Sequence, residues 1–398
     1  MAIILSYKIA NKQFMSLGTN NKTAVKKNAS KSLLSKTVSF LHLWLGLLAG
    51  SVLIVVALTG CILSFEKELT PVLFSKEQQV TPKPQRLHID SLVEVAKTNY
   101  PKKKIFRMML SSEADRSVKA TFGTKKLGYD YVYLNPYSGE ILSKGKENER
   151  FFTVVLNLHR LLLAGTVGKT ITGISCAITF FMTISGLYLW WPKNRKVLKR
   201  RLVVKQNASF KRTNWDLHAV GGFYVMIFLF LITLTGLIWS YDWVENMMFK
   251  ITDGKVSKPE VVKQPEVKEK KEAGLYEKIV SATNTIYAHE GDLTINFPDK
   301  KDKPILVSKE NGEARVNTVD QVYFNNRNGE LIEKRPFAGL TLGNQLRKLN
   351  KPIHTGSIFG WPTKLLMFMV SLLTASLPIT GLLIYLGRGK KKKKAVVV

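Results

Sequence analysis

The chain has 398 residues, 45% of them hydrophobic, and its 60 Lys+Arg against 29 Asp+Glu give a formal net charge of +31. So large a basic excess argues against an ordinary cytosolic enzyme and leaves nucleic acid or a membrane surface as candidate partners. With two cysteines in all, Cys61 and Cys176, the sequence excludes a Cys-ligated zinc site, a Cys-ligated iron–sulfur cluster and a disulfide-stapled fold.

Four apolar segments decide the class of protein. Each is long enough to cross a bilayer, which takes about 20 helical residues. In chain order they are residues 43–65, 171–191, 219–241 and 363–386, and the charge they carry is Lys364, at an edge. The sequence therefore predicts a multi-pass α-helical membrane protein with four transmembrane helices in contact with the lipid bilayer.

The charge is distributed unevenly around these spans. Three short segments, 1–41, 192–217 and 387–398, together hold 21 of the 31 net positive charges, whereas the two long loops are nearly balanced. The positive-inside rule then places both termini and the linker in the cytoplasm and both long loops outside. Basic runs of this kind are topology signals, so no nucleic acid is expected as a partner.

Each long loop is predicted to form a small α+β domain outside the membrane. A short amphipathic helix (91–100 and 276–287) precedes a strand, a turn with Asn and Gly, and a second strand (132–142 and 322–332), which is typical of a hairpin. The Lys-, Glu- and Pro-rich stretch 255–272 is predicted to be a disordered linker. The predicted units are a basic N-terminus (1–41), span 1 (42–65), outer domain 1 (66–150), an interfacial helix with span 2 (151–191), a basic linker (192–217), span 3 (218–241), outer domain 2 (242–339), an interfacial helix with span 4 (340–386) and a basic tail (387–398).

Repeated spacings predict that the chain is a tandem duplication. Each span ends in a small residue followed by Gly: Thr59-Gly60, Ser185-Gly186, Thr235-Gly236 and Thr380-Gly381. Each also has a histidine upstream. His42 and His218 lie 18 residues before the glycines of spans 1 and 3, and His159 and His354 lie 27 residues before those of spans 2 and 4. Two independent spacings that both recur without slippage indicate an internal repeat.

These four histidines are the candidate cofactor ligands. His42 and His218 begin spans 1 and 3 on the cytoplasmic side, and His159 and His354 precede spans 2 and 4 on the outer side. Two neutral imidazoles from facing helices can hold a haem iron from both faces, so the pairs predict two haems b, one near each face of the membrane. The alternative for any single histidine is an interfacial side chain with a satisfied hydrogen bond.

Zinc is a poorer candidate than haem at these four histidines, and the remaining histidines and the cysteines are not candidate ligands. Zinc needs a third or fourth ligand, and apart from Asp216 no acidic residue or cysteine lies near these histidines at helical spacing. His88 and His289 have no repeat partners and are predicted to be surface residues. Cys61 and Cys176 lie at non-equivalent places within spans, which favours buried, inert thiols.

Gly46 and Gly222 are candidate haem-contact residues. Each lies one helical turn after a histidine, His42 or His218, on the same helix face, where a planar porphyrin needs backbone room. The alternative is close helix–helix packing, to which Gly46-x-x-x-Gly50 also conforms. The sequence has no Gly-rich nucleotide-binding motif, no Walker A run and no metalloprotease or serine-hydrolase motif. Electrons from the cytoplasm would then come from a partner, such as a flavoprotein reductase, or from a reduced quinone.

The runs around these residues resemble the PepSY-associated transmembrane (PepSY-TM) family, from about Lys36 to Gly389. They are HLWLGLLAG (42–50) with LTG (58–60), LHRLLLAG (158–165), SGLYLWWP (185–192) and WDLHAVGG (215–222). The resemblance implies PepSY domains in both outer loops and a multi-pass protein of the bacterial inner membrane linked with iron uptake. Similar members include haem-containing reductases of ferric siderophores, and others are fused to flavoprotein reductase domains. At His354-Thr355-Gly356 the sequence departs from the family's usual His-Arg-type run.

The sequence therefore supports one leading hypothesis and two rivals. The leading one is a redox protein that passes electrons outward through two haems to a periplasmic ferric siderophore, as a ferric-chelate reductase would. The first rival is a membrane-anchored PepSY module that binds or restrains an envelope protease or other partner without catalysis. The second is a transporter subunit, which is weaker because no span carries a buried charge or an interrupted helix pair.

Overall fold

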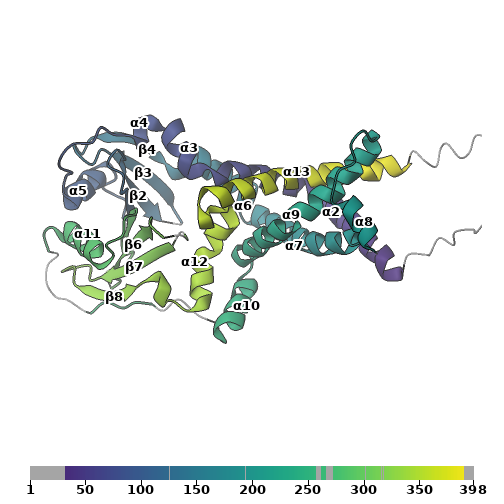
Figure 1. The fold of residues 1–398 in the computed structure, drawn as a ribbon. Helices are drawn as coiled ribbons and strands as arrows, with labels where there is room; N and C mark the ends of the chain where they lie inside the picture. Colours follow the sequence, from purple (N-terminus) through teal and green to yellow (C-terminus); the bar gives the residue numbers. More distant parts are fainter. Residues whose placement is uncertain are drawn as a thin grey trace, which may run out of the picture.

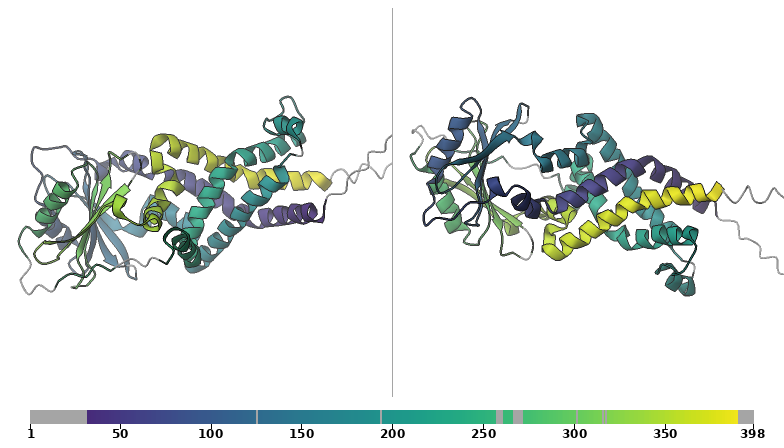
Figure 2. Two further views of the ribbon diagram at one scale, coloured as in Figure 1. Left: turned by 60° about the horizontal axis from the view of Figure 1, so that its bottom comes forward. Right: turned by 90° about the horizontal axis from the view of Figure 1, so that it is seen from above.

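The structure, a computed structural model, describes residues 32–389 except 125, 193, 257–260, 266–271, 301, 315 and 317. A bundle of long helices forms one end of the molecule and a β-sheet with its covering helices forms the other (Figures 1 and 2). The start of α2 (Leu33–Ser64), the short helix α8 (Arg195–Arg201) and the end of α13 (Trp361–Gly389) lie at the bundle end away from the sheet (Figure 1).

In the described part of the chain, four helices are long and apolar enough to cross a membrane, which confirms the four predicted spans. They are α2, α7 (Gly165–Trp190), α9 (Phe210–Ser240) and α13. α2 packs against α7, α7 against α9, α9 against α13, and α13 against α2, so the four helices form a closed ring. A Cβ on Gly50 of α2 would lie 2.9 Å from Cβ of Pro378 of α13, so this glycine permits a close helix contact.

α2 and α9 begin well before their apolar segments. α2 begins at Leu33 and α9 at Phe210, so His42 and His218 lie inside these helices. The prediction that they begin the helices is wrong by about two turns. The hydropathy pattern misses these turns because they contain polar residues. The start of α2 is instead marked by Ser32, the N-cap residue, whose side chain accepts a hydrogen bond from the Ser35 N–H at 3.3 Å.

Short helices connect the spans to the sheet. The predicted helices before spans 2 and 4 are present as α6 (Phe151–Leu161) and α12 (Leu342–Thr355). Each ends in a left-handed residue, Leu162 after α6 (φ 47°) and Gly356 after α12 (φ +79°), and a span follows a few residues later. The remaining short helices are α3 (Glu66–Leu73), α4 (Ser75–Gln78), η1 (Glu147–Glu149), α10 (Asp242–Asp253), η2 (Phe337–Gly339) and η3 (Ser357–Phe359).

The two outer segments share one antiparallel sheet of eight described strands in the order β4-β3-β2-β1-β5-β6-β7-β8. The strands of the first segment pair with those of the second at its centre, where β1 lies beside β5 from Arg107↔Asn296 to Leu110↔Leu293. The pairing covers an edge that each half would otherwise expose. The strands are β1 (Ile105–Leu110), β2 (Val118–Thr124), β3 (Gly128–Leu134), β4 (Ile141–Lys146), β5 (Leu293–Asn296), β6 (Ile305–Asn311), β7 (Thr318–Phe324) and β8 (Leu331–Arg335).

Two helices cover the face of the sheet that is turned away from the bundle, α5 (Ile89–Asn99) and α11 (Leu275–Ile286) (Figure 1). They are the helices predicted for 91–100 and 276–287. One apolar core, which includes Phe122 and Phe324, runs under both. The helices also cap each other: Glu277 of α11 accepts the Ile89 N–H at 2.8 Å, and Asp90 of α5 accepts the Glu277 N–H at 2.9 Å. Apolar burial and reciprocal capping therefore join the two outer segments.

The predicted strand–turn–strand units are present as β3–β4 and β7–β8. Both turns close with the same backbone bond, from the Asn135 N–H to the Glu140 carbonyl and from the Asn325 N–H to the Glu330 carbonyl, each at 2.8 Å. Of the predicted linker 255–272, residues 257–260 and 266–271 lie outside the described residues. Residues 261–265 form no helix or strand, and the Pro265 carbonyl accepts a bond from the Asn325 side chain at 3.3 Å.

Candidate functional site

The structure brings the four repeated histidines together as two pairs. His42 on α2 and His218 on α9 have ring centres 6.5 Å apart with planes at 90°. We call these two residues the inner pair, because they lie toward the bundle end away from the sheet. The two rings come from helices that are not neighbours in the four-helix ring, so the inner pair meets across the middle of the bundle.

The outer pair consists of His159 and His354, at the end of the bundle nearer the sheet. His159 lies on α6 and His354 on α12, with ring centres 6.2 Å apart and planes at 82°. The ring of Trp239 lies 5.1 Å from that of His354. Both pairs therefore combine one histidine from the first half of the chain with one from the second.

Every one of the four rings is held through Nδ1 by the hydroxyl that precedes a span's terminal Gly. His42 contacts Ser185 Oγ at 2.9 Å, His159 contacts Thr59 Oγ1 at 3.0 Å, His218 contacts Thr380 Oγ1 at 3.0 Å and His354 contacts Thr235 Oγ1 at 2.9 Å. Among the described residues, Nε2 of these four histidines has no hydrogen-bond partner. The nitrogen that remains free on each ring is thus Nε2.

The outer histidines, which lie on helices outside the spans, are held neutral. Burial lowers the pKa of His354 to about 3, and the neighbouring His159 is the second cause. Burial also lowers the pKa of His159. A neutral imidazole with Nδ1 hydrogen-bonded can offer the Nε2 lone pair to a metal.

The spacing of each pair suits one metal atom between two imidazoles. Two metal–nitrogen bonds of about 2 Å, with each ring centre about 1.1 Å behind its nitrogen, put the ring centres roughly 6.3 Å apart. Within the described residues there is no group of three or more His, Cys, Asp or Glu that could hold a metal ion. Asp216, the one acidic neighbour noted in the sequence, instead accepts bonds from Arg212 and from the Lys205 N–H. Two ligands per site suit a haem iron, whose other ligands come from the porphyrin.

Gly46 and Gly222 lie beside the inner pair, each against a side chain from an adjacent span. A Cβ on Gly46 would lie 2.8 Å from Cε of Met182, and one on Gly222 would lie 3.8 Å from Cδ2 of Leu377. Met182 and Leu377 each lie three residues before the hydroxyl residue that holds an inner histidine, Ser185 or Thr380. The two glycines thus occupy equivalent places, one helical turn from each inner ring.

The remaining histidines and the cysteines lie apart from these pairs. His88 is exposed, as predicted, with 70% of its side chain accessible. His289 is mostly buried, so its assignment as a surface residue is wrong; its Nε2 lies 2.9 Å from the Asp320 carboxylate, which compensates for burial. Cys61 is buried on α2, and the Cys176 thiol lies 3.4 Å from the Thr233 carbonyl of α9.

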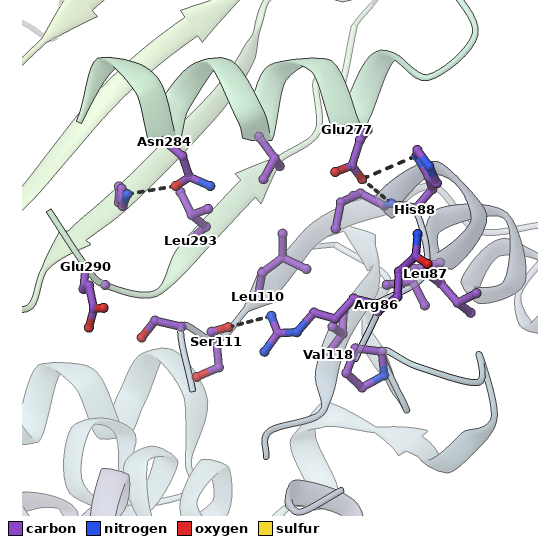
Figure 3. A pocket seen from close by; sticks show the side chains of 18 of the residues that line it. Arg86, Leu87, His88, Leu110, Ser111, Val118, Glu277, Asn284, Glu290 and Leu293 are labelled. Carbon is purple, nitrogen blue, oxygen red and sulfur yellow. Dashed lines mark hydrogen bonds and ion pairs between the residues drawn. The ribbon is translucent and has the colours of Figure 1, made fainter. Parts of the chain in front are cut away.

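A second feature lies on the far side of the sheet from the bundle, a cavity of about 610 Å³ between α5 and α11. Figure 3 shows Arg86, His88 and Glu277 around it, with Leu110 and Leu293 from the central strands at its base. Arg86 donates to the Ser111 carbonyl at 3.1 Å, and His88 lies 3.8 Å from Glu277. Its polar side chains come from both outer segments, so the cavity exists because the two segments share one sheet.

The sequence identified the four histidines as ligand candidates but assigned no role to the hydroxyl residues that hold them. Thr59, Ser185, Thr235 and Thr380 were noted only as small residues at the span ends. The signal was the recurrence of a hydroxyl at all four places, but spacing alone does not reveal which histidine each one contacts.

Comparison with known proteins gives one result for nearly the whole chain. A family model described as "PepSY-associated TM region" matches residues 40–388, which include all four predicted spans and all four paired histidines. Comparison with curated proteins gives no match.

Proposed function

The chain belongs to the family of PepSY-associated transmembrane proteins, and from the two histidine pairs within its bundle we propose that it carries electrons across a membrane through two bound haems. The observation that carries the proposal is that each pair has ring centres 6.2–6.5 Å apart, with Nε2 left without a protein partner. The membrane in question is the bacterial inner membrane.

Each haem site draws its ligands from this chain's own residues. His42 and His218 would hold the inner haem b, and His159 and His354 the outer one, each through Nε2. A bound haem supplies one-electron chemistry, because its iron alternates between the ferric and ferrous states. Gly46 and Gly222 have no side chain, so beside the inner histidines a flat group would be able to approach the backbone of α2 and α9.

The two sites are spaced along the bundle axis. His42 and Thr59 lie 17 residues apart on α2, which corresponds to about 25 Å of helix, and Thr59 contacts the outer His159. A bilayer core is about 30 Å thick, so the inner and outer pairs lie near its opposite faces. Electrons entering at the inner pair would leave at the outer pair.

The acceptor that suits this direction is a ferric siderophore or similar chelate in the periplasm. One electron converts the ferric ion to the ferrous ion, which hard oxygen ligands hold less tightly, and the iron is released. The protein would thus act as a ferric-chelate reductase in iron uptake. The donor would be a cytoplasmic flavoprotein reductase or a reduced quinone.

We further propose that the chain is a tandem duplication with two PepSY-like halves in its outer sheet. We place both termini and the linker around α8 in the cytoplasm. Two observations support this: α8 is rich in basic residues, and the start of α2, α8 and the end of α13 all lie at the bundle end away from the sheet. Reporters fused at Asn194 should remain cytoplasmic, and those fused at Lys144 or Lys268 should be exported. The opposite result at either loop would overturn this orientation.

A second candidate function rests on the cavity between α5 and α11. Its mixed polar and apolar lining could bind a segment of an envelope protease or another partner, and the spans would then serve only as an anchor. In that case the histidine pairs would carry no cofactor.

The absorbance spectrum of the detergent-purified protein separates the two functions. We expect a haem band that sharpens on reduction, with two haems per chain by pyridine haemochrome assay. In vesicles with an internal reductant, ferric chelate outside should be reduced, as reported by a ferrous-specific dye. A pure, monodisperse preparation that takes up no haem, even from added hemin, would overturn the redox function and leave the binding module.

A further inference from the structure

Four hydroxyl–glycine pairs contact the four histidines, and the proposed function assigns them no role. Each pair lies near the end of one span and contacts a histidine on another helix of the same half of the chain. Thr59-Gly60 on α2 contacts His159, whereas Ser185-Gly186 on α7 contacts His42. The second half repeats this exchange, with Thr235 of α9 on His354 and Thr380 of α13 on His218.

The helix backbone favours one direction for these hydrogen bonds. Each hydroxyl has one proton, and it donates that proton to a carbonyl one turn back in its own helix; Ser185 Oγ lies 3.0 Å from the Phe181 carbonyl. The oxygen can then only accept from the ring. For His159 and His218, Nδ1 also lies 2.9 and 3.1 Å from the carbonyls of Val56 and Leu377, which cannot donate.

The carbonyl contacts therefore place the proton of a neutral His159 or His218 ring on Nδ1, and we assign the same tautomer to His42 and His354, whose Nδ1 atoms contact equivalent hydroxyls. A neutral imidazole has one N–H and one lone pair, so the lone pair is on Nε2. The hydroxyls thus select the tautomer in which the free nitrogen can bind a metal.

In three of the four pairs the glycine makes room for the edge of the same ring; at Gly236 a Cβ would lie 3.0 Å from Sγ of Cys176 and 3.8 Å from Cε1 of His354. A Cβ on Gly60 would lie 3.3 Å from Cε1 of His159, and one on Gly381 would lie 3.3 Å from Cε1 of His218. The corresponding distance is 3.4 Å for Gly186 and His42. These distances are tighter than, or at the limit of, ordinary contact, so a larger residue would push the ring off its hydroxyl.

We propose that the four pairs, Thr59-Gly60, Ser185-Gly186, Thr235-Gly236 and Thr380-Gly381, are positioning residues for the haem ligands, an inference that rests on the proposed function. The hydroxyl fixes the Nδ1–H tautomer and orients the ring, and the glycine seats it against the helix. Each half of the chain thereby orients one candidate ligand for each haem site. A haem iron held by both histidines of a site would link the two halves.

Ser185 gives the most sensitive test of this role. In the described part of the chain, its hydroxyl is the one acceptor for Nδ1 of His42. Nδ1 of His218, in the same inner site, has the Leu377 carbonyl as a second acceptor. Ser185→Ala should weaken inner-haem affinity by about 10–100-fold, as loss of an outer-shell partner of a metal-bound histidine does. It should also raise the midpoint potential of the inner haem, because an imidazole without its acceptor donates less charge to ferric iron. Thr380→Val should have a smaller effect on both measurements.

The matched control is Thr183→Val, two residues away on the same helix. Thr183 is equally buried, and its hydroxyl bonds to the Phe180 carbonyl at 2.7 Å without contacting a histidine. Haem affinity and potential should match the unmodified protein in this variant, and Ser185→Thr should restore both. The outer haem, retained in all four variants, reports that the bundle is folded.

The outcomes separate this inference from the function on which it rests. If Ser185→Ala binds the inner haem with the affinity and potential of Thr183→Val, the positioning role is wrong and the haem sites stand. If Ser185→Ala does not accumulate, an unchanged potential in Thr380→Val overturns the role, and a raised one supports it. If the unmodified protein binds no haem, the proposed function itself fails.

Discussion

The inner and outer histidine pairs reach nearly the same geometry by different routes. The inner rings project from the interior of two long helices, α2 and α9, whose helical turns continue past His42 and His218 on both sides. The outer rings come from short helices, α6 and α12, which end within three residues of the histidine. Ring spacing, the use of Nδ1 and the hydroxyl–glycine contact are nevertheless common to both.

This difference indicates what each pair depends on. Inner histidine positions follow from helix packing, because each inner ring moves with an entire span. Outer histidine positions follow from the turn that joins a short helix to the next span. In the first half that turn places Leu162 and Leu163 at positive φ, whereas in the second half Gly356 takes the equivalent conformation without steric cost.

The largest expected effect comes from removing a ligand. His42→Ala and His218→Ala should each remove the same haem, about half of the total, because an iron held by two imidazoles loses its site with either one. The double variant should lose no more than either alone. His159→Ala and His354→Ala should remove the other half. Haem per chain and the spectrum of the remaining haem measure this directly.

The same experiment can show that the inner and outer pairs are not separate sites. If His42→Ala and His159→Ala behave as one site, with no further loss in the double variant, then each half holds its own haem and the inner and outer pairs are not functional units. His88→Ala, at an exposed position away from both pairs, is the matched control and should retain all the haem.

A smaller, strictly inner effect is expected at the glycines. Gly222→Phe should reduce inner-haem content, because the ring would fill the space beside His218, whereas Gly222→Ala should fit, with its nearest neighbour 3.8 Å away. The matched control is Gly221→Phe, since nothing lies within 4 Å of that position. Gly46→Phe should resemble Gly222→Phe. Normal inner-haem content in both Phe variants would assign these glycines to helix packing alone.

Gly356, in the turn after His354, is a position where a side chain should disturb the outer pair. A Cβ on Gly356 would lie 2.6 Å from the Thr363 carbonyl oxygen and 2.7 Å from Cγ of Met367, at φ +79°. Gly356→Ala should therefore combine about 1–2 kcal/mol of backbone strain with a clash of similar size, and should lower outer-haem retention while sparing the inner haem.

Gly254→Ala separates these two costs. Gly254, which follows α10, has the same left-handed conformation as Gly356 (φ 71°, ψ −7°), but nothing lies within 4 Å of its Cβ position, so this variant carries the strain alone. Outer-haem retention measured after gel filtration should fall less in Gly254→Ala than in Gly356→Ala. Equal losses would show that backbone strain, and not the contact with α13, controls the outer site.

The sequence predicted those features that repeat locally. Hydropathy located the spans, and the two spacings of 18 and 27 residues singled out four histidines that the structure brings together as two pairs. The helix starts were missed because the turns of α2 and α9 that precede the apolar segments contain polar residues, so hydropathy does not mark where these helices begin.

Contacts between distant segments could not be predicted in this way. The pairing of β1 with β5 joins strands almost 200 residues apart, and a row of apolar side chains does not indicate which edge it will meet. The burial of His289, in the loop before β5, depends on Asp320 of β7, 31 residues away. The partner of each hydroxyl also depends on how α2 and α7 pack, which periodicity does not specify.

The smallest expected effect concerns a lysine that the two halves use differently. Lys169 at the start of α7 is exposed, whereas the equivalent Lys364 of α13 is 8% exposed and forms an ion pair with Glu68 of α3. Lys364→Met should lower stability by about 1–3 kcal/mol, because it leaves a partly buried carboxylate without its cation. Lys169→Met should change stability by less than about 0.5 kcal/mol. Thermal unfolding in detergent measures both, and adding Glu68→Gln should recover much of the loss in Lys364→Met. No recovery in that double variant would mean that the lysine stabilises α13 by packing of its stem and not by its charge.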